Sequence, residues 1–361
     1  MSSTKKLRIA FIGAGGIAGA HLKALAKMED VEVVALADSK NDPMMRYAEE
    51  YNIPAKHCYD DPQTMLEKVE PDAVSVCTPN GEHCPNTIAA LKAGSHVIVE
   101  KPMAMSAEEA RQMVDTAKAV DRKLVIGFQY RYDPRTQFLK QAVDDGVLGK
   151  VMFGRVQAMR RRGIPNWGVF GQKKLQGGGP MIDIGVHVLE MCHYTMGSPK
   201  PVAAVGMTDT YLGNKPSAVK SSWPNWDHKT YTVEDFACGH IRFDNGAVIH
   251  VESMFAGHIE REVMDFQLMG HKGGGLWSDS KIFTDQLGHM VDIKPNYLPP
   301  HNFGMFFDWK LRNFVDHVLY NKPTGAPAEH GLLVQQMLDG VYRSAEQGGK
   351  EVALDELVAV E

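Results

Sequence analysis

The stretch GGGPMIDIGVHVLE, residues 177–190, combines an acid and an imidazole with apolar neighbours. Asp183 and His187 are four residues apart, so a helix over this stretch places both side chains on one face, one turn apart. Histidine is the usual general base for removing a hydroxyl proton near neutral pH. One interpretation is therefore a catalytic pair that faces a cavity, and the other is a structural Asp–His pair in the core.

A glycine-rich turn near the N-terminus predicts a second kind of site. Residues 13–18, GAGGIA, fit the pattern G-x-G-x-x-G/A between a predicted strand and a predicted helix. Gly13 permits a tight turn, and Gly15 lets the backbone approach a pyrophosphate. The helix that begins around Gly16 and Ile17 offers its N–H groups to the anion, and Ala18 permits close packing of helix and strand. The motif predicts a dinucleotide site.

Asp38 ends the second predicted strand, at the distance from the glycines where a ribose-binding acid belongs. Its carboxylate can accept a hydrogen bond from the 2′-hydroxyl of NAD and would repel the 2′-phosphate of NADP. NAD is therefore the predicted cofactor. Ser39 and Lys40 follow directly and could accommodate a phosphate, which leaves NADP open as the alternative.

Lys101, in the stretch VIVEKPM, lies at the predicted carboxyl end of a strand. In open α/β sheets this edge is where ligands bind, and Pro102 restricts the backbone at Lys101. A lysine beside substrate and a positively charged nicotinamide ring loses its proton more easily. The alternative is a strand-end lysine in solvent, which is the commoner situation for a lone lysine.

The predicted elements that position these residues change in character along the chain. In the first 130 residues, strands alternate with helices, which predicts a doubly wound parallel Rossmann sheet covered on both faces. The predicted strands there are 7–12, 31–38, 72–78, 96–101 and 123–129, and the predicted helices are 17–28, 43–51, 85–94 and 107–120.

Strands then follow strands, and Asn245-Gly246 between two apolar runs predicts a hairpin. We therefore expect an α/β protein with an NAD(P)-binding domain over 1–127 and an α+β domain over 128–361. The second domain is predicted to hold a large, mostly antiparallel open sheet and to bind substrate and other subunits. Its last helices, within 309–320 and 330–349, are candidates for packing back on the first domain.

The composition limits the possible classes of protein. The chain has 361 residues, 44% hydrophobic and 23% charged, with a net charge of −5. This mixed charge argues against nucleic acid as a partner, and no apolar run approaches the 18 residues of a membrane span. Five scattered cysteines without a CxxC pair predict reduced thiols and a cytoplasmic protein. The histidines show neither HExxH nor a Cys/His cluster, so no metal is expected.

Three motifs together resemble one family. Residues 13–18, Glu100-Lys101-Pro102 and Asp183-x-Gly185-x-His187, in this order and spacing, look like the Gfo/Idh/MocA family (glucose–fructose oxidoreductase, inositol dehydrogenase and rhizopine catabolism). The resemblance covers nearly the whole chain, and the last two motifs are far more specific than the glycines. CTPNGEH, residues 77–83, also resembles the family's loop beside the cofactor.

The resemblance implies NAD(P)-dependent redox chemistry on a sugar, sugar derivative or cyclitol. Lys101 would hydrogen-bond the reacting hydroxyl and lie by the cofactor, His187 would be the general base, and Asp183 would orient the substrate or the histidine. Thr78, Asn80, His83 and Glu100 would lie near the cofactor.

Further residues are candidates for binding the substrate. Arg160, Arg161 and Arg162 alternate sides if the chain is extended, so one or two could face the pocket, and we select Arg160 and Arg162. Trp167 could stack on a sugar face or border the nicotinamide, and Arg131 is a weaker candidate. The β-rich second half predicts a homodimer or homotetramer, because its sheet would otherwise expose one face.

Two alternative functions stay open at this stage. One is a glycosidase that uses bound NAD for transient oxidation of a sugar hydroxyl. The other is a nucleotide-sensing regulator on the same fold, against which the retention of Lys101, Asp183 and His187 argues. The sequence does not name the sugar, the carbon that reacts or the physiological direction.

Overall fold

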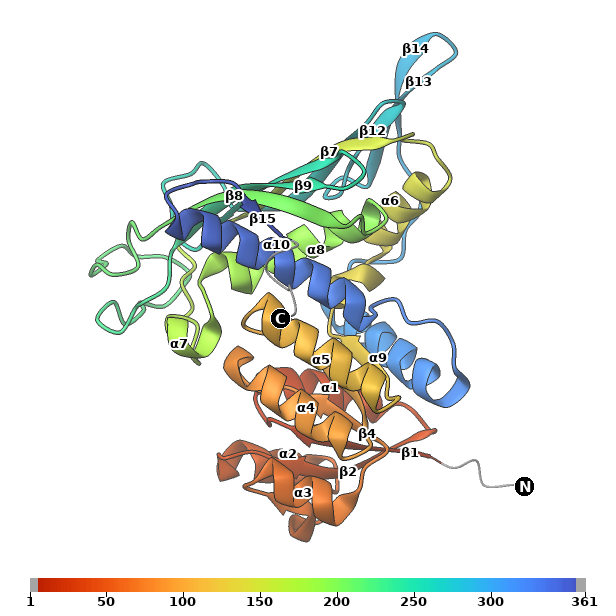
Figure 1. The fold of residues 1–361 in the computed structure, drawn as a ribbon, viewed down its shortest axis with the longest axis vertical. Coiled ribbons are helices and arrows are strands. Elements are labelled where there is room, and N and C mark those ends of the chain that lie inside the picture. The colour runs from red at the N-terminus through yellow and green to blue at the C-terminus, as the bar shows by residue number, and fades with distance from the viewer. Residues whose placement is uncertain (1–5, 355–361) are drawn as a thin grey trace. The chain divides into compact units, whose positions relative to one another are not determined.

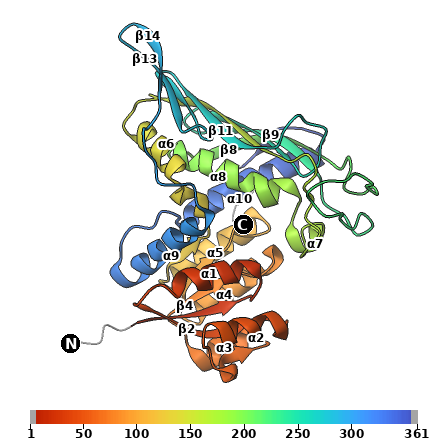
Figure 2. The same cartoon turned by 180° about the vertical axis from the view of Figure 1, so that it is seen from behind.

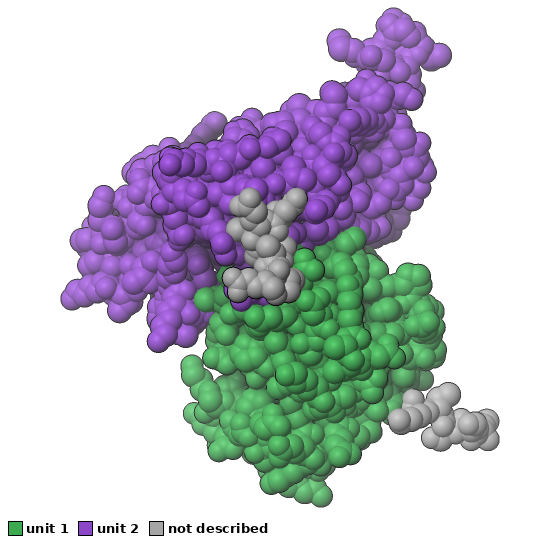
Figure 3. All heavy atoms as spheres, viewed as in Figure 1, with its two compact units in different colours: residues 1–105, 109–129, 302–332 green, residues 106–108, 130–301, 333–361 purple. Residues whose placement is uncertain are grey.

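The structure is a computed structural model that describes residues 6–354. The chain forms two compact units (Figure 3). Within the described range, unit 1 holds residues 6–105, 109–129 and 302–332, and unit 2 holds residues 106–108, 130–301 and 333–354. Each unit therefore contains segments that are far apart in the sequence. Among residues 6–354, no helix is both long and apolar enough to cross a membrane.

Unit 1 is built on a six-stranded sheet in the order β3-β2-β1-β4-β5-β6, and every neighbouring pair is parallel. The strands are β1 Leu7–Ile12, β2 Val31–Ala37, β3 Cys58–Tyr59, β4 Ala73–Val76, β5 His96–Val99 and β6 Leu124–Ile126. Nearly every residue of β1, β4 and β5 is buried, as expected for strands covered on both faces. This is the predicted Rossmann sheet, with the strand order of dinucleotide-binding folds.

Helices pack around this sheet (Figure 1). They are α1 Gly16–Leu25, α2 Asn41–Glu50, α3 Pro62–Val69, α4 His83–Lys92, α5 Ala107–Ala119 and α9 Phe303–Tyr320. Helix α9 comes from the C-terminal part of the chain and packs against α1, and the two lie side by side in Figure 2 as well. Asn302 caps α9 by accepting a hydrogen bond from the Gly304 N–H at 3.0 Å.

Unit 2 contains a nine-stranded sheet in the order β14-β13-β12-β11-β7-β10-β9-β8-β15. Its strands are β7 Val151–Met159, β8 Pro201–Asp209, β9 Phe236–Phe243, β10 Val248–Met254, β11 Val263–Gly270, β12 Gly273–Leu276, β13 Lys281–Gln286, β14 His289–Ile293 and β15 Val352–Ala353. Neighbouring strands are antiparallel except β7 and β10, which are parallel. The predicted hairpin at Asn245-Gly246 is confirmed: it joins β9 to β10, and Gly246 has φ of 84°.

Helices of unit 2 lie on one face of this sheet. They are α6 Pro134–Asp144, α7 Lys173–Gln176, α8 Val186–Thr195 and the larger part of α10 Ala328–Glu346. Helix α8 packs on strands β7 and β11. Buried and partly exposed residues alternate along β10, so its other side chains point away from the core. The predicted mostly antiparallel open sheet is therefore confirmed.

Candidate active site

The glycine turn after β1 holds Asp38 through its backbone. Gly13 has φ of 92°, and a Cβ there would lie 2.7 Å from the Cys77 carbonyl oxygen, so only glycine fits. One Asp38 oxygen accepts a hydrogen bond from the Ala14 N–H at 2.6 Å, and the other accepts from the Lys40 N–H at 2.7 Å. The carboxylate thus lies beside the start of α1, where the ribose-binding acid is expected. Ser39 and Lys40 are both exposed.

The next glycines are not explained by packing within the protein. A Cβ at Gly15 or Gly16 would meet no atom of the described residues within 4 Å. Both glycines stand at the start of α1, ahead of Ile17 and the buried Ala18, where unpaired N–H groups attract an anion. Thr78 Oγ1 is buried and finds no hydrogen-bond partner among residues 6–354. An open glycine cradle with a nearby buried hydroxyl fits a dinucleotide.

His83 connects the loops that follow β4 and β5. Its Nδ1 lies 2.7 Å from the Pro102 carbonyl oxygen, and its Nε2 lies 3.0 Å from the Thr78 carbonyl oxygen. The ring is buried, and this burial lowers the pKa of His83 despite the two carbonyls. Asn80 is buried in the same loop. His83 therefore fixes two loops at the carboxyl edge of the sheet.

Glu100 belongs to a buried charged cluster beneath this edge. Its Oε1 contacts both the Lys310 ammonium and His21 Nε2, the latter at 2.8 Å, and His21 Nδ1 lies 2.8 Å from the Ser75 hydroxyl. Burial alone would raise the pKa of Glu100, but Lys310 and His21 hold it well below its usual range. Burial, followed by the charge of Lys310, lowers the pKa of His21 to about 4. Glu100 is therefore a carboxylate and His21 a neutral imidazole.

Lys101 directly follows this cluster. Its backbone N–H donates to Glu100 Oε2 at 3.3 Å, and the Lys101–Pro102 peptide bond is cis. The Lys101 side chain is partly exposed, whereas Glu100 and Pro102 are buried. Lys101 is thus held at the end of β5 by buried neighbours on both sides, next to the loops that carry Thr78 and His83.

The segment of Asp183 and His187 differs from the single α-helix that the spacing predicts. Met181–Gly185 is a π-helical turn, in which the Val186 N–H bonds the Met181 carbonyl five residues back, and α8 begins only at Val186. Such turns occur often at functional sites. From residue 178 to residue 193, His187 is the one residue that is not buried, and Asp183 is 8% exposed. A buried helix therefore presents one imidazole near the surface.

The glycines before this segment allow a close approach to Glu234. A Cβ at Gly179 would lie 2.0 Å from the Glu234 carbonyl oxygen, and a Cβ at Gly178 would lie 2.2 Å from the Tyr342 hydroxyl. The Gly179 N–H donates to one Glu234 side-chain oxygen at 2.9 Å, and the Tyr342 hydroxyl donates to the other at 2.7 Å. Burial raises the pKa of Glu234. Glu234 therefore fixes the backbone at Gly179, just before the π-helical turn that carries Asp183.

Tyr130 and Arg160 surround the pair from other elements of unit 2. The ring of Tyr130 meets that of His187 edge to face, with centroids 5.1 Å apart. The Arg160 guanidinium lies over the rings of Trp223 at 4.6 Å and Phe255 at 5.6 Å. Burial lowers the pKa of Arg160, and the charge of Asp183 opposes this shift. The surroundings of Asp183 and His187 thus include the Arg160 guanidinium and the Tyr130 side chain.

Two other predicted substrate residues have different surroundings. Arg131 is fully buried, where its Nε donates to Glu190 and its guanidinium lies 4.6 Å from the Tyr194 ring centroid. Arg162 donates to the Arg161 carbonyl at 2.8 Å and lies 3.2 Å from His258 Nε2. Arg131, paired with a buried glutamate, packs in the core, and Arg162 joins its own loop to the loop of His258. A contact of either arginine with substrate stays a prediction.

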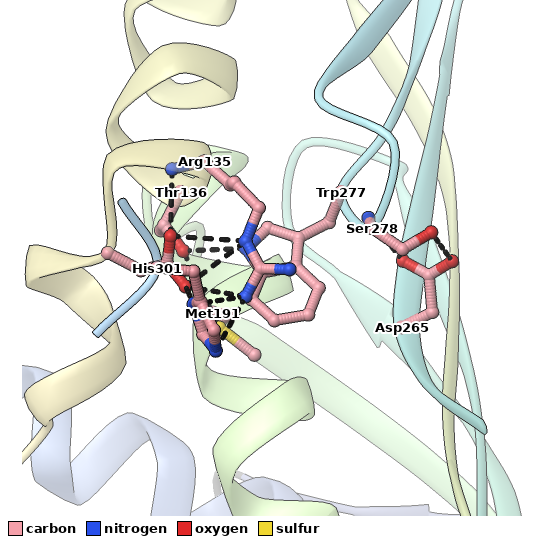
Figure 4. A network of polar contacts seen from close by, with 8 residues as sticks. Arg135, Thr136, Met191, Asp265, Trp277, Ser278 and His301 are labelled. Atoms are coloured by element: carbon pink, nitrogen blue, oxygen red, sulfur yellow. Dashed lines mark hydrogen bonds and ion pairs between the residues drawn. The ribbon is translucent and has the colours of Figure 1, made fainter. Parts of the chain in front are cut away.

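A polar network contacts the middle of α8, at Met191 (Figure 4). The Trp277 indole N–H donates to Thr136 Oγ1 at 2.9 Å, and this hydroxyl donates to the Met191 sulfur at 3.5 Å. Arg135 lies 3.7 Å from the Trp277 ring centroid. Since Met191 is one turn after His187, the network connects the orientation of the histidine to α6 and the sheet.

Four residues that were not predicted from the sequence contact predicted site residues or their neighbours. In unit 2 they are Tyr130, Trp223 and Glu234, and in unit 1 it is Lys310, which contacts Glu100. Of these four, only Tyr130 could have been selected from its local sequence, because it directly follows the predicted strand 123–129, at the edge where ligands bind. Within residues 6–354, no three or more His, Cys, Asp or Glu side chains are grouped so that they could hold a metal ion.

The two units define an oxidoreductase with an NAD-binding Rossmann domain. Residues 7–128 match the model of the Gfo/Idh/MocA oxidoreductase family with NAD-binding Rossmann fold, and residues 140–354 match its C-terminal alpha/beta domain. The chain belongs to this family.

Several relatives cover almost the full length of the chain. It is 38% identical to D-glucoside 3-dehydrogenase of Escherichia coli K12, over 96% of this chain and 97% of that protein. It is 30% identical to myo-inositol 2-dehydrogenase of Thermotoga maritima, over 98% and 100%. The crystal structure of aldose-aldose oxidoreductase from Caulobacter crescentus superposes with a TM-score of 0.77 at 25% identity, covering 97% of this chain and all of that one.

Proposed function

We propose that this protein is an NAD-dependent dehydrogenase that oxidises a secondary hydroxyl of a sugar, a sugar derivative or a cyclitol, or reduces the matching ketone. The observation that carries the proposal is the partly exposed His187 on the otherwise buried segment 178–193, with Asp183 one turn away. The glucoside and inositol dehydrogenases among its relatives support this substrate class. D-glucosides are therefore the first compounds to test.

The roles of the side chains follow from their chemistry. His187 takes the proton of the substrate hydroxyl as general base, because a neutral imidazole is the strongest base available near neutral pH. Asp183 orients the substrate or the imidazole and stabilises the positive charge that His187 acquires. Lys101 donates a hydrogen bond to the oxygen of the reacting hydroxyl. When bound, NAD supplies the acceptor for the hydride that leaves the substrate carbon.

The cofactor would be held by residues of unit 1. Gly13, Gly15 and Gly16 would hold the pyrophosphate through backbone N–H groups at the start of α1, and Asp38 would accept a hydrogen bond from the adenosine ribose. Thr78 would satisfy its buried hydroxyl on the same ligand. These residues bind and orient NAD, whereas the proton is handled by the side chains named above.

The test is a panel of sugars and cyclitols with NAD, followed by NADH absorbance at about 340 nm. His187→Ala should lower turnover by roughly 10²–10⁴-fold, the contribution of a general base, with NAD affinity little changed. Lys101→Ala should also lower turnover. His289→Ala, at an exposed histidine of the same unit, is the matched control and should keep full turnover. Full turnover in His187→Ala would disprove the assignment, and glycoside cleavage without net NADH would favour the glycosidase alternative.

A further inference from the structure

We propose that Trp167 and Trp223 bind the group that is attached to the oxidised sugar through its glycosidic oxygen. The inferred ligand is the flat face of an aglycone or of a second sugar ring, so the substrate is a glycoside rather than a free monosaccharide. This inference rests on the proposed function and adds a binding subsite to it.

The two tryptophans form an open aromatic surface. Their indole rings are stacked, with centroids 5.7 Å apart and planes 9° from parallel. Phe170 supports Trp167 edge to face at 6.3 Å. Trp167 nevertheless stays 53% exposed, whereas Trp277 of the same unit is 3% exposed. Exposed aromatic groups gathered in one place mark binding surfaces rather than core packing.

Arg160 connects this surface to the candidate active site. Its guanidinium lies 4.6 Å from the Trp223 ring centroid, and the negative charge of Asp183 opposes the lowering of the Arg160 pKa by burial. Its Nη1 donates to the Gly163 carbonyl oxygen at 2.9 Å, which fixes the side chain in this direction. Trp223 contacts Arg160 and stacks on Trp167, so the three side chains form a row from Arg160 through Trp223 to Trp167. The Trp167 end of this row is the place of a substituent on the reacting sugar.

The loop that carries Trp223 is held in shape before any ligand arrives. This loop joins β8 to β9, and the buried Asp235 carboxylate at its end accepts hydrogen bonds from the N–H groups of Tyr211, Leu212 and Gly213, at 2.9, 2.6 and 2.6 Å. The Trp226 indole N–H donates to the Gly213 carbonyl at 2.7 Å. A surface that is already ordered loses little entropy when it binds a ligand.

The chemistry of the surface selects the ligand. The faces of stacked indoles bind flat groups with apolar faces, such as an aryl ring or the C–H face of a pyranose, through contact area and ring stacking rather than through a pattern of hydrogen bonds. The polar groups lie at the other end of the row, at Arg160 and Asp183. A ligand that fits this row has a sugar ring near Arg160 and Asp183, where it is oxidised, and a flat group against the tryptophans. A glycoside has both parts.

The experiment compares three substrates in the intact protein with NAD: phenyl β-D-glucoside, cellobiose and methyl β-D-glucoside. Trp167→Ala should lower kcat/KM about tenfold for phenyl glucoside through loss of stacking, and cellobiose should follow if a sugar ring is also accepted. Methyl glucoside should change less than about twofold, because it has no ring to stack. Tyr297→Ala, at a 78% exposed aromatic residue of the same unit, is the matched control and should change none of the three.

Two kinetic results would overturn the inference. One is an equal loss with all three glucosides, and the other is weaker NAD binding by Trp167→Ala, which would place this residue at the nicotinamide instead. If the wild-type protein oxidises none of them, the proposed function fails in its glucoside form. Calorimetric binding of phenyl glucoside in the presence of NAD then decides the inference: about tenfold weaker binding in Trp167→Ala supports it. Unchanged binding, or no binding to the wild type, overturns it.

Discussion

Replacement of Lys310 by methionine tests the charged cluster of unit 1 directly. Lys310 is 1% exposed, Glu100 is 4% exposed, and His21 is fully buried. Methionine keeps most of the side-chain volume, so the main change is the loss of one buried positive charge. Glu100 then keeps only neutral partners, His21 and the Lys101 backbone N–H, among the hydrogen bonds described above, and it is almost completely shielded from water.

The expected cost follows from this burial. Removing one member of a buried ion pair leaves an uncompensated charge and costs about 3–5 kcal/mol of unfolding free energy. For a unit of this size, about 2–4 °C of melting temperature corresponds to each kcal/mol, so a loss of roughly 6–20 °C is expected near neutral pH. Exposed ion pairs are worth about 0–1 kcal/mol by comparison, so Lys27→Met, which breaks the exposed Lys27–Asp308 pair, is the matched control.

The pH dependence gives the sharper test. In the wild type the pKa of Glu100 is depressed, so the pair stabilises the protein above the unfolded pKa of about 4.3 and this stability is lost as the pH falls through the folded pKa. Lys310→Met removes the largest influence that lowers the pKa of Glu100, so burial should raise this pKa above the unfolded value against the remaining influence of His21. The deficit should therefore be largest near pH 7.5 and shrink toward pH 5.

Thermal unfolding of both proteins at pH 5 and pH 7.5 measures this difference. The double variant Glu100→Gln/Lys310→Met removes both charges and should recover part of the lost stability. A deficit below about 1 kcal/mol at pH 7.5, the value of an exposed pair, would refute the reasoning, as would a deficit that does not change with pH.

Three further predictions concern the cofactor, the catalytic segment and assembly. Wild-type protein should bind NAD more tightly than NADP, and Asp38→Ala should narrow the gap; tighter NADP binding in a titration of both cofactors would contradict this. Gly179→Ala should lower the melting temperature and turnover while NAD affinity stays unchanged, because its Cβ would lie 2.0 Å from the Glu234 carbonyl oxygen. The protein should be a homodimer or homotetramer by light scattering, since the large sheet exposes methionines such as Met207 and Met269; a monomer at micromolar concentration would rule this out.

Local patterns in the sequence were enough for five of the six strands of the Rossmann sheet, all but the two-residue β3, and for its glycine turn. Strands such as Leu7–Ile12 are apolar runs, interrupted there only by Arg8, because both faces of a parallel sheet are buried. The turn at Gly13 needs a residue that tolerates positive φ. The Asn245-Gly246 hairpin was equally visible, since two residues determine the turn. Asp183, His187 and Lys101 were selected for their chemistry and spacing, and their catalytic roles stay predictions.

The short strands of unit 2 beyond β11 were not predicted. Strand β12, Gly273–Leu276, begins with three glycines and has no apolar alternation, so its pairing with β11 and β13 alone makes it a strand. The π-helical turn at Met181–Gly185 was also missed, because the spacing of Asp183 and His187 fits a regular α-helix equally well.

Only the tertiary structure decided which distant residues meet. Lys310 contacts Glu100 because α9, from the C-terminal part of the chain, belongs to unit 1. Trp223 contacts Arg160 from the loop before β9, whose backbone N–H groups donate hydrogen bonds to Asp235. A sequence motif records contacts between near neighbours, in which the spacing itself determines the geometry. The partners of a buried charge or an exposed ring lie hundreds or tens of residues away, and their identity follows from packing and from the cost of leaving a buried charge unpaired.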